Sequence, residues 1–82
     1  MKLPRDLSGA ELARALAALG YTVTRQTGSH LRLSTLEGGE HHVTVPVHKA
    51  IPLGTLRAIL RQVGGHLQVS LEDLAPRLFR SK

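Results

Sequence analysis

The sequence predicts an α+β fold, in which a three-stranded antiparallel sheet carries two helices on one face. Apolar residues recur at helical spacing in two segments, around residues 9–19 and 55–63, and alternate with polar residues in three short stretches between them. Each predicted helix has a single apolar stripe, so both should cover the same face of the sheet in a two-layer sandwich. The length of 82 residues predicts one domain, residues 1–82, that ends in a short helical turn and a basic tail.

A capping box marks the start of the first helix. Ser8 is followed three residues later by Glu11, so each side chain can bond the other residue's backbone N–H. Gly20 stands where a glycine typically ends a helix. The apolar stripe between them is expected to consist of Leu12, Ala15, Leu16 and Leu19.

Three strands are predicted within residues 21–24, 29–34 and 42–48. The odd-numbered residues of these stretches are mostly apolar and the even-numbered ones mostly polar, which is typical of strands with one buried and one solvated face. Residues opposite each other across a ladder share a face, so we expect a three-residue connection, residues 37–39 or 38–40, or a bulge between the second and third strands. Leu33 is then expected opposite Val43 or Val45. Pro46 donates no backbone hydrogen bond, which predicts an edge position for its strand.

The second helix is predicted after Pro52, with Thr55 as its N-cap and Gly64 and Gly65 as its end. Its apolar stripe contains Leu56, Ile59, Leu60 and Val63, and Arg57 and Arg61 lie together on another face. Ser70 and Asp73 then predict one more helix start, which Pro76 is expected to break after one short turn. The basic tail from about residue 77 contains Arg77, Arg80 and Lys82.

The composition favours a polyanionic partner. Eleven Lys and Arg against six Asp and Glu give a formal net charge of +5, and eight of the eleven are arginines, which form forked contacts with phosphate. Absence of cysteine excludes disulfides and thiolate chemistry, and 2% aromatic residues give little support to an aromatic platform for stacked bases. No apolar run approaches the length of a membrane span and no signal peptide is predicted, so the cytoplasm is the expected compartment.

His30 is the candidate catalytic residue. It lies on the solvated face of its strand with Arg32, directly after the flexible, hydroxyl-bearing pair Gly28 and Ser29. An imidazole titrates near neutral pH and can take the proton of a ribose 2′-OH, while cations stabilise the charge that develops on the phosphate. The expected RNA-binding residues are Gly28, Ser29, Arg25, Arg32, Lys49, Arg57 and Arg61.

Other roles for the histidines are those of ordinary surface residues or of metal ligands. An exposed strand histidine is commonly an ordinary surface residue, and a cross-strand pair of His30 and His48 offers only two metal ligands. We therefore expect no metal and no cofactor. The residues do not decide whether His42 or His48 assists His30. No acidic residue is predicted in the strand core, so no Ser-His-acid triad is expected.

Several motifs resemble the HicA (YcfA-like) mRNA interferase toxins. They are Gly20-Tyr21, Gly28-Ser29-His30, the stretch from Val43 through Pro46 to His48, and Gly54-Thr55-Leu56-Arg57 followed by Ile59-Leu60. They occur in the order of that family and extend over most of the chain. Many family members have a second histidine after the first, where this chain has Leu31.

The resemblance implies a fold like that of double-stranded-RNA-binding domains and a metal-independent endoribonuclease that cuts mRNA. The catalytic histidine of the family corresponds to His30, and a HicB-type antitoxin is the implied partner. The toxin could be a homodimer or form a hetero-oligomer with that antitoxin. The alternative is an RNA-binding or translation-regulating module of the same fold without catalysis. A purely structural partner domain is a third reading.

Overall fold

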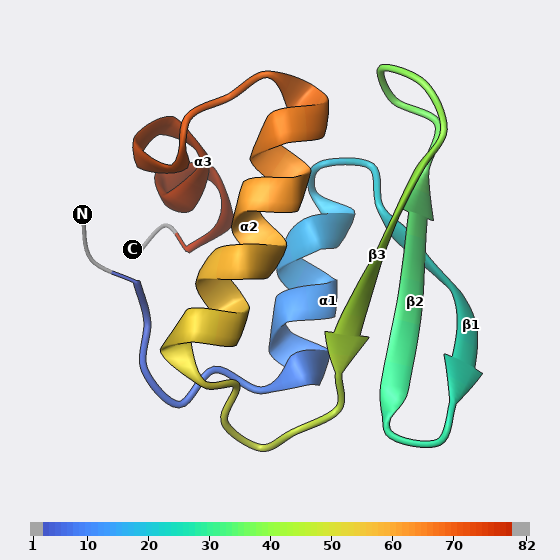
Figure 1. The fold of residues 1–82 in the computed structure, drawn as a ribbon, viewed down its shortest axis with the longest axis vertical. Coiled ribbons are helices and arrows are strands. Elements are labelled where there is room, and N and C mark those ends of the chain that lie inside the picture. Colours follow the sequence, from blue (N-terminus) through green and yellow to red (C-terminus); the bar gives the residue numbers. More distant parts are fainter. Residues whose placement is uncertain (1–2, 80–82) are drawn as a thin grey trace.

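The computed structural model describes residues 3–79 and has two layers, a sheet and a layer of helices (Figure 1). The chain forms a helix, three strands and then two helices, which confirms the predicted α+β class with three helices instead of two and a turn. The elements are α1 (Gly9–Ala17), β1 (Thr22–Thr27), β2 (His30–Thr35), β3 (His41–Pro46), α2 (Leu53–Leu67) and α3 (Leu71–Leu78). Among the described residues, no helix is both long and apolar enough to cross a membrane.

The sheet is antiparallel in the order β1-β2-β3, so β2 is central and β1 and β3 are edges. Leu33 pairs with Val43, which confirms one of the two predicted registers, and Pro46 lies in an edge strand as predicted. The connection between β2 and β3 has five residues, 36–40, instead of three, because the pairing of the strands ends at Thr35 and His41. One face packs against α1 and α2, and the other is open to solvent. The core consists of Leu12, Leu16, Tyr21, Leu31, Leu33, Val43, Val45, Ile51, Leu56, Ile59, Leu60, Val63 and Leu74.

The first helix begins as predicted. Ser8 accepts a hydrogen bond from the backbone of Glu11, whose carboxylate accepts one from the backbone of Ser8. At the next residue, Gly9, the helix approaches the end of β3 so closely that a Cβ would overlap the carbonyl oxygen of Pro46. The Gly9 N–H donates to the carbonyl of His48 at 2.9 Å, which fixes the start of α1 to the chain leaving the sheet.

The strand β1 departs from simple alternation. Val23 was expected on the buried face, but its side chain is 50% exposed, and all six residues of β1 are exposed. The pairing shifts between Val23 and Arg25, so that Val23 pairs with Leu33 while Arg25 pairs with Arg32. This bulge reverses the parity of the strand beyond it and places Arg25 on the open face.

The third strand ends at Pro46, two residues earlier than predicted. Val47, expected on the buried face, is 40% exposed. Its N–H donates to the carbonyl of Ser29 at 2.6 Å, while the next carbonyl accepts from Gly9. The pairing with the β1–β2 turn therefore extends by one hydrogen bond beyond β3, and from His48 onward the chain contacts the start of α1.

Both predicted ends of α2 are wrong. The helix begins at Leu53 with Pro52 as N-cap, so Thr55 lies inside its first turn and makes no cap. It also continues through Gly64 and Gly65 to Leu67, and Gln68 ends it in a left-handed conformation with φ 59°. Gly64 is buried because the chain folds back over it: an added Cβ would lie 2.6 Å from the carbonyl oxygen of Val69. This glycine permits close packing and does not stop the helix.

The C-terminal segment forms a real helix, α3, instead of a single turn. Ser70 caps it as predicted, by accepting from the N–H of Asp73. Pro76 lies within the helix, where it removes one hydrogen bond, but Leu74 and Ala75 are buried against the core and α2. The burial of these apolar side chains outweighs that local loss. Arg77 belongs to α3, whereas Arg80 and Lys82 of the predicted tail lie outside the described residues.

Candidate functional site

Two adjoining hollows lie on the open face of the sheet. Alternate residues of β2 face solvent here, namely His30, Arg32 and Ser34. Their partners on β3 are Pro46, Thr44 and His42, and those on β1 are Thr27, Arg25 and Thr22. Because β2 is hydrogen-bonded on both sides, the positions of its side chains are well fixed.

The smaller hollow, of about 220 Å³, contains His30. Its other lining residues are Arg25, Thr27, Arg32 and Thr44. The structure therefore places the candidate histidine on the solvated face beside two arginines from two strands. A phosphodiester in this hollow would lie next to an imidazole and two guanidinium groups, which are the groups that transfer a proton and stabilise negative charge.

The tight turn between β1 and β2 positions His30. Thr27 pairs with His30, so the turn consists of Gly28 and Ser29 alone. Gly28 has φ 55°, which suits the first central position of a type II′ turn and which a glycine adopts without strain. The carbonyl of Ser29 accepts from Val47, so the turn also contacts the chain that follows β3.

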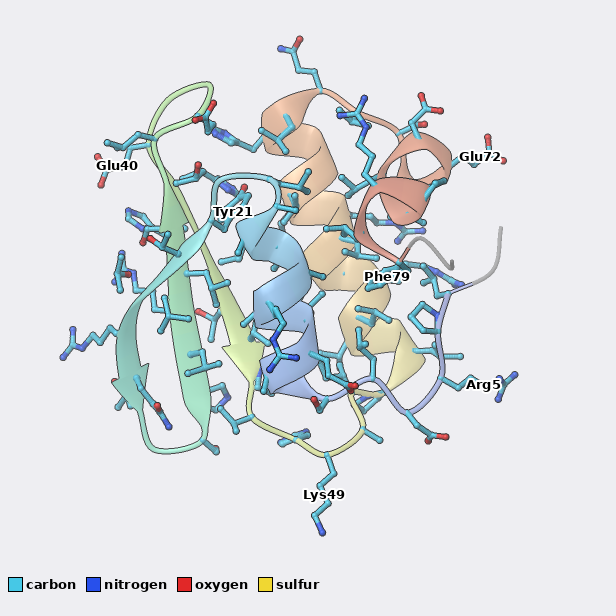
Figure 2. The ribbon with its side chains drawn as sticks, turned by 180° about the vertical axis from the view of Figure 1, so that it is seen from behind. Arg5, Tyr21, Glu40, Lys49, Glu72 and Phe79 are labelled. Carbon is cyan, nitrogen blue, oxygen red and sulfur yellow. The ribbon has the colours of Figure 1, made fainter. Side chains whose placement is uncertain are left out.

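Lys49 lies on that following segment, at the same end of the molecule as the β1–β2 turn (Figure 2). It is exposed and lines neither hollow. It projects away from the fold and adds positive charge at this end of the molecule.

Arg57 and Arg61 are not brought to His30. Both are exposed on α2, which packs against the buried side of the sheet, and neither lines a hollow. His66, on the same helix, reaches the loop between β2 and β3. At 3.6 residues per turn, Arg57 lies about 180° and Arg61 about 140° around the helix from His66. They therefore belong to another surface of the molecule.

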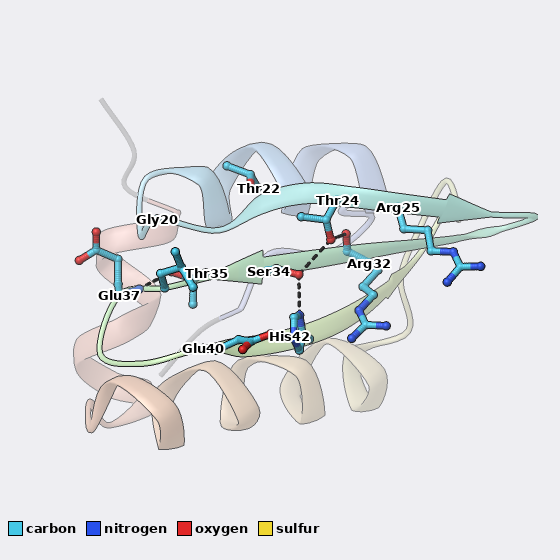
Figure 3. Close-up of a pocket in the computed structure, with 11 residues that line it drawn as sticks. Gly20, Thr22, Thr24, Arg25, Arg32, Ser34, Thr35, Glu37, Glu40 and His42 are labelled. Atoms are coloured by element: carbon cyan, nitrogen blue, oxygen red, sulfur yellow. Dashed lines mark hydrogen bonds and ion pairs between the residues drawn. The ribbon is translucent and has the colours of Figure 1, made fainter.

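The larger hollow, of about 670 Å³, begins at the same two arginines (Figure 3). Arg25 and Arg32 line both hollows, so the two adjoin at these arginines. Its remaining lining residues are Gly20, Thr22, Thr24, Ser34, Thr35, Leu36, Glu37, Glu40 and His42. Arginines lie at one end and the carboxylates of Glu37 and Glu40 toward the other.

A chain of hydrogen bonds crosses this larger hollow. The carboxylate of Glu40 lies 3.0 Å from Nε2 of His42, and Nδ1 of His42 lies 2.6 Å from Oγ of Ser34. Ser34 in turn lies 2.9 Å from Oγ1 of Thr24, which donates to the carbonyl of Arg32. Glu40 lies just before β3, two residues from His42 along the chain, and its side chain is 70% exposed, so it is not a buried acid of the strand core. The register supplies the other partner of His42, because it pairs Ser34 with His42.

The series of hydrogen bonds from Glu40 to Thr24 does not reproduce a hydrolase triad. His42 and Ser34 are solvent-accessible, and Ser34 is also hydrogen-bonded to Thr24. The backbone N–H groups of a central strand are used in the ladder, so β2 offers no pair of free donors to form an oxyanion hole. The arrangement is suited to binding a polar ligand.

Two other histidines, His41 and His66, support the loop of residues 36–40. The ring of His66 stacks on His41 with centroids 4.3 Å apart, and its Nε2 donates to the carbonyls of Glu37 and Gly39. Burial lowers the pKa of His41, and the neighbouring histidines His66 and His42 lower it further. The buried Tyr21 hydroxyl, whose pKa is raised by burial, lies 2.8 Å from Nδ1 of His41. These contacts fix the loop that forms one wall of the larger hollow.

Metal-binding geometry does not occur within residues 3–79, where no three His, Asp or Glu side chains come together. His30 and His48 are also not a cross-strand pair, because Pro46 is the partner of His30.

A family model for the HicA toxin of bacterial toxin-antitoxin systems matches residues 9–64. No curated protein and no solved structure matches the chain. The matched segment extends from the first residue of α1 into α2 and contains the whole sheet with both hollows. The chain belongs to the HicA toxin family, and its role is that of a toxin that pairs with an antitoxin.

Proposed function

We propose that this HicA-family toxin is a metal-independent endoribonuclease that cleaves mRNA in the cytoplasm, with His30 as its general acid and base. The observation that carries the proposal is the shared hollow of His30, Arg25 and Arg32 on the open face of the sheet. A proton acceptor can take the proton of the ribose 2′-OH, and the two cations can stabilise the charge that develops on the phosphate during transesterification.

In the proposed reaction, His30 takes the proton of a ribose 2′-OH. The 2′ oxygen then forms a bond to the adjacent phosphorus, and the bond from phosphorus to the 5′ oxygen breaks. The proton passes from His30 to the leaving 5′ oxygen, which leaves a 2′,3′-cyclic phosphate and a free 5′-OH. Arg25 and Arg32 stabilise the additional negative charge on the phosphate oxygens in the transition state.

Inhibition is proposed to occur by direct covering of this face. A HicB-type antitoxin with acidic side chains would be attracted by the net charge of +5 and would hide His30. A complex that leaves His30 fully open to solvent would contradict this part of the proposal.

The test compares the chain with its His30→Ala variant on 5′-labelled RNA, with and without EDTA. Only the unchanged chain should produce fragments, EDTA should have no effect, and only the unchanged chain should arrest growth when expressed. Both proteins should bind an uncleavable RNA similarly. Equal cleavage by both would remove His30 from the reaction, and loss of cleavage in EDTA would contradict the metal-free mechanism.

A non-catalytic RNA-binding module is the second candidate. It is favoured by one observation: within residues 3–79 the imidazole of His30 makes no hydrogen bond, whereas His41, His42 and His66 each do. An imidazole without an orienting partner is also what an ordinary surface histidine shows. Binding without cleavage by either protein would support this candidate.

A further inference from the structure

We propose that the larger hollow is a nucleotide subsite, which takes the nucleotide next to the phosphate held by Arg25 and Arg32 and selects bases that carry an exocyclic amino group. The inference rests on the proposed function, because it assigns single-stranded RNA as the ligand of the open face. It adds a site of base selection made by Glu40 and His42, on the side of the arginines away from His30.

The two hollows adjoin at the arginines. Arg25 and Arg32 line both of them, so a phosphate bound there has His30 on one side and His42 on the other. Along β2, His30 and Ser34 are four residues apart, about 13 Å at about 3.3 Å per residue, with Arg32 midway. A strand of RNA that follows β2 would therefore place one nucleotide in each hollow.

The charges of the larger hollow give the nucleotide a direction. The arginines attract the phosphate, whereas Glu37 and Glu40 toward the other end repel it and accept hydrogen bonds (Figure 3). Carboxylates bind the amino groups of bases, and uracil has no amino group. Leu36, 83% exposed at the hollow, offers an apolar surface to the face of a base.

The chain of hydrogen bonds holds Glu40 in position. One carboxylate oxygen of Glu40 faces His42, and its other oxygen accepts no hydrogen bond from residues 3–79. Nε2 of His42 lies against Glu40 and Nδ1 against Ser34, Ser34 is hydrogen-bonded to Thr24, and Thr24 donates to the carbonyl of Arg32. The second carboxylate oxygen of Glu40, a residue that lines the hollow, is left to accept from a ligand.

The experiment measures binding separately from cleavage. Four 5′-fluorescein-labelled 2′-O-methyl trinucleotides lack the attacking 2′-OH and carry A, C, G or U at both ends with uridine in the middle, so strand direction does not matter. Their affinities for the full chain are measured by fluorescence anisotropy. One hydrogen bond to a charged group should favour each amino-bearing trinucleotide over the all-uridine one by about tenfold.

Glu40→Ala and His42→Ala are expected to abolish this preference, because the first removes the acceptor and the second releases it. Glu72→Ala on α3 is the matched control: it removes the same charge at an exposed position on another side of the molecule (Figure 2). It should raise all four affinities equally and keep the preference. Circular dichroism checks that the variants fold.

Equal affinities for the four trinucleotides in the unchanged chain, or a preference that persists in Glu40→Ala and His42→Ala, would overturn the subsite. Cleavage of unmodified RNA is followed in parallel. Base preference without any cleavage would contradict the proposed nuclease activity but support the subsite. Cleavage without base preference would support the nuclease activity but contradict the subsite.

Discussion

The position of the arginines leads to a quantitative prediction for the salt dependence of RNA binding. Arg25 and Arg32 are on the open face with His30, whereas Arg61 is on α2. Arg32→Gln and Arg61→Gln change the net charge of the chain equally. If RNA binds the open face, only the first variant removes a phosphate contact.

The magnitude follows from counterion release. Each phosphate neutralised on a single strand contributes about −0.7 to the slope of log affinity against log salt concentration. Two contacts, from Arg25 and Arg32, give a slope of about −1.4, or roughly sevenfold weaker binding between 50 and 200 mM salt. Arg32→Gln should reduce the slope to about −0.7, which is roughly a 2.6-fold loss over the same range. Arg61→Gln should leave the slope unchanged.

The assay is fluorescence anisotropy with a labelled 2′-O-methyl hexanucleotide at five salt concentrations. Other cations, Lys49 among them, add to the slope of every variant, so the difference between variants is the quantity to compare. Equal reductions in the slope for Arg32→Gln and Arg61→Gln would show that RNA responds to overall charge or contacts α2 as well. That result would refute the assignment of the open face as the RNA-binding surface.

Three further predictions test the fold around the site. Leu74→Ala should lower the free energy of unfolding by about 2–5 kcal/mol in urea titrations, because this fully buried residue fixes α3 to the core; an exposed tail would lose almost nothing. Gly9→Ala should destabilise the chain, because the added Cβ overlaps the carbonyl of Pro46. Gly54→Ala should stabilise it by about 0.5–1 kcal/mol, because the added Cβ meets open space at a position within α2. Equal urea midpoints for the two variants would contradict the close contact at Gly9. The pKa of His41 is lowered in the folded chain, so the unfolded chain binds more protons below the ordinary value of 6.5. Stability should therefore fall as the pH drops below about 6.5, and His41→Gln should weaken this dependence in urea titrations between pH 5 and 8.

The sheet register illustrates what periodicity predicts. Alternation assigned Leu33 and Val43 to one face, and only an odd connection satisfies that assignment, so the pairing was limited to two registers. In the observed register the loop of residues 36–40 packs on His66, a long-range contact on which alternation contains no information. The series of hydrogen bonds from Glu40 to Thr24 requires Ser34 to lie opposite His42, which is true in only one of the two registers. These hydrogen bonds could therefore not be predicted from the sequence.

The failures at β1 and α2 have the same physical origin. The bulge between Val23 and Arg25 is defined by the partner strand, and local alternation contains no information on it. Gly64 and Gly65 resemble a helix end locally, but Gly64 is needed because Val69 packs across it. In both places a contact between segments, and not local propensity, determines the structure. The capping box at Ser8 and the N-cap at Ser70 are purely local and were predicted correctly.

The central position of β2 makes this strand a suitable place for the proposed site. An edge strand moves more easily because only one side of its backbone is paired, but β2 is hydrogen-bonded to β1 and β3 along its length. Its open-face residues His30, Arg32 and Ser34 therefore keep their spacing before any ligand binds, and their buried neighbours Leu31 and Leu33 anchor the strand to the helices. Such preorganisation lowers the entropic cost of placing a phosphate between the general base, His30, and the cation, Arg32. It also means that a core substitution such as Leu33→Ala should reduce cleavage more than its loss of stability explains. Cleavage rates measured well below its melting temperature would check this expectation, and full activity there would show that the strand is not what positions His30.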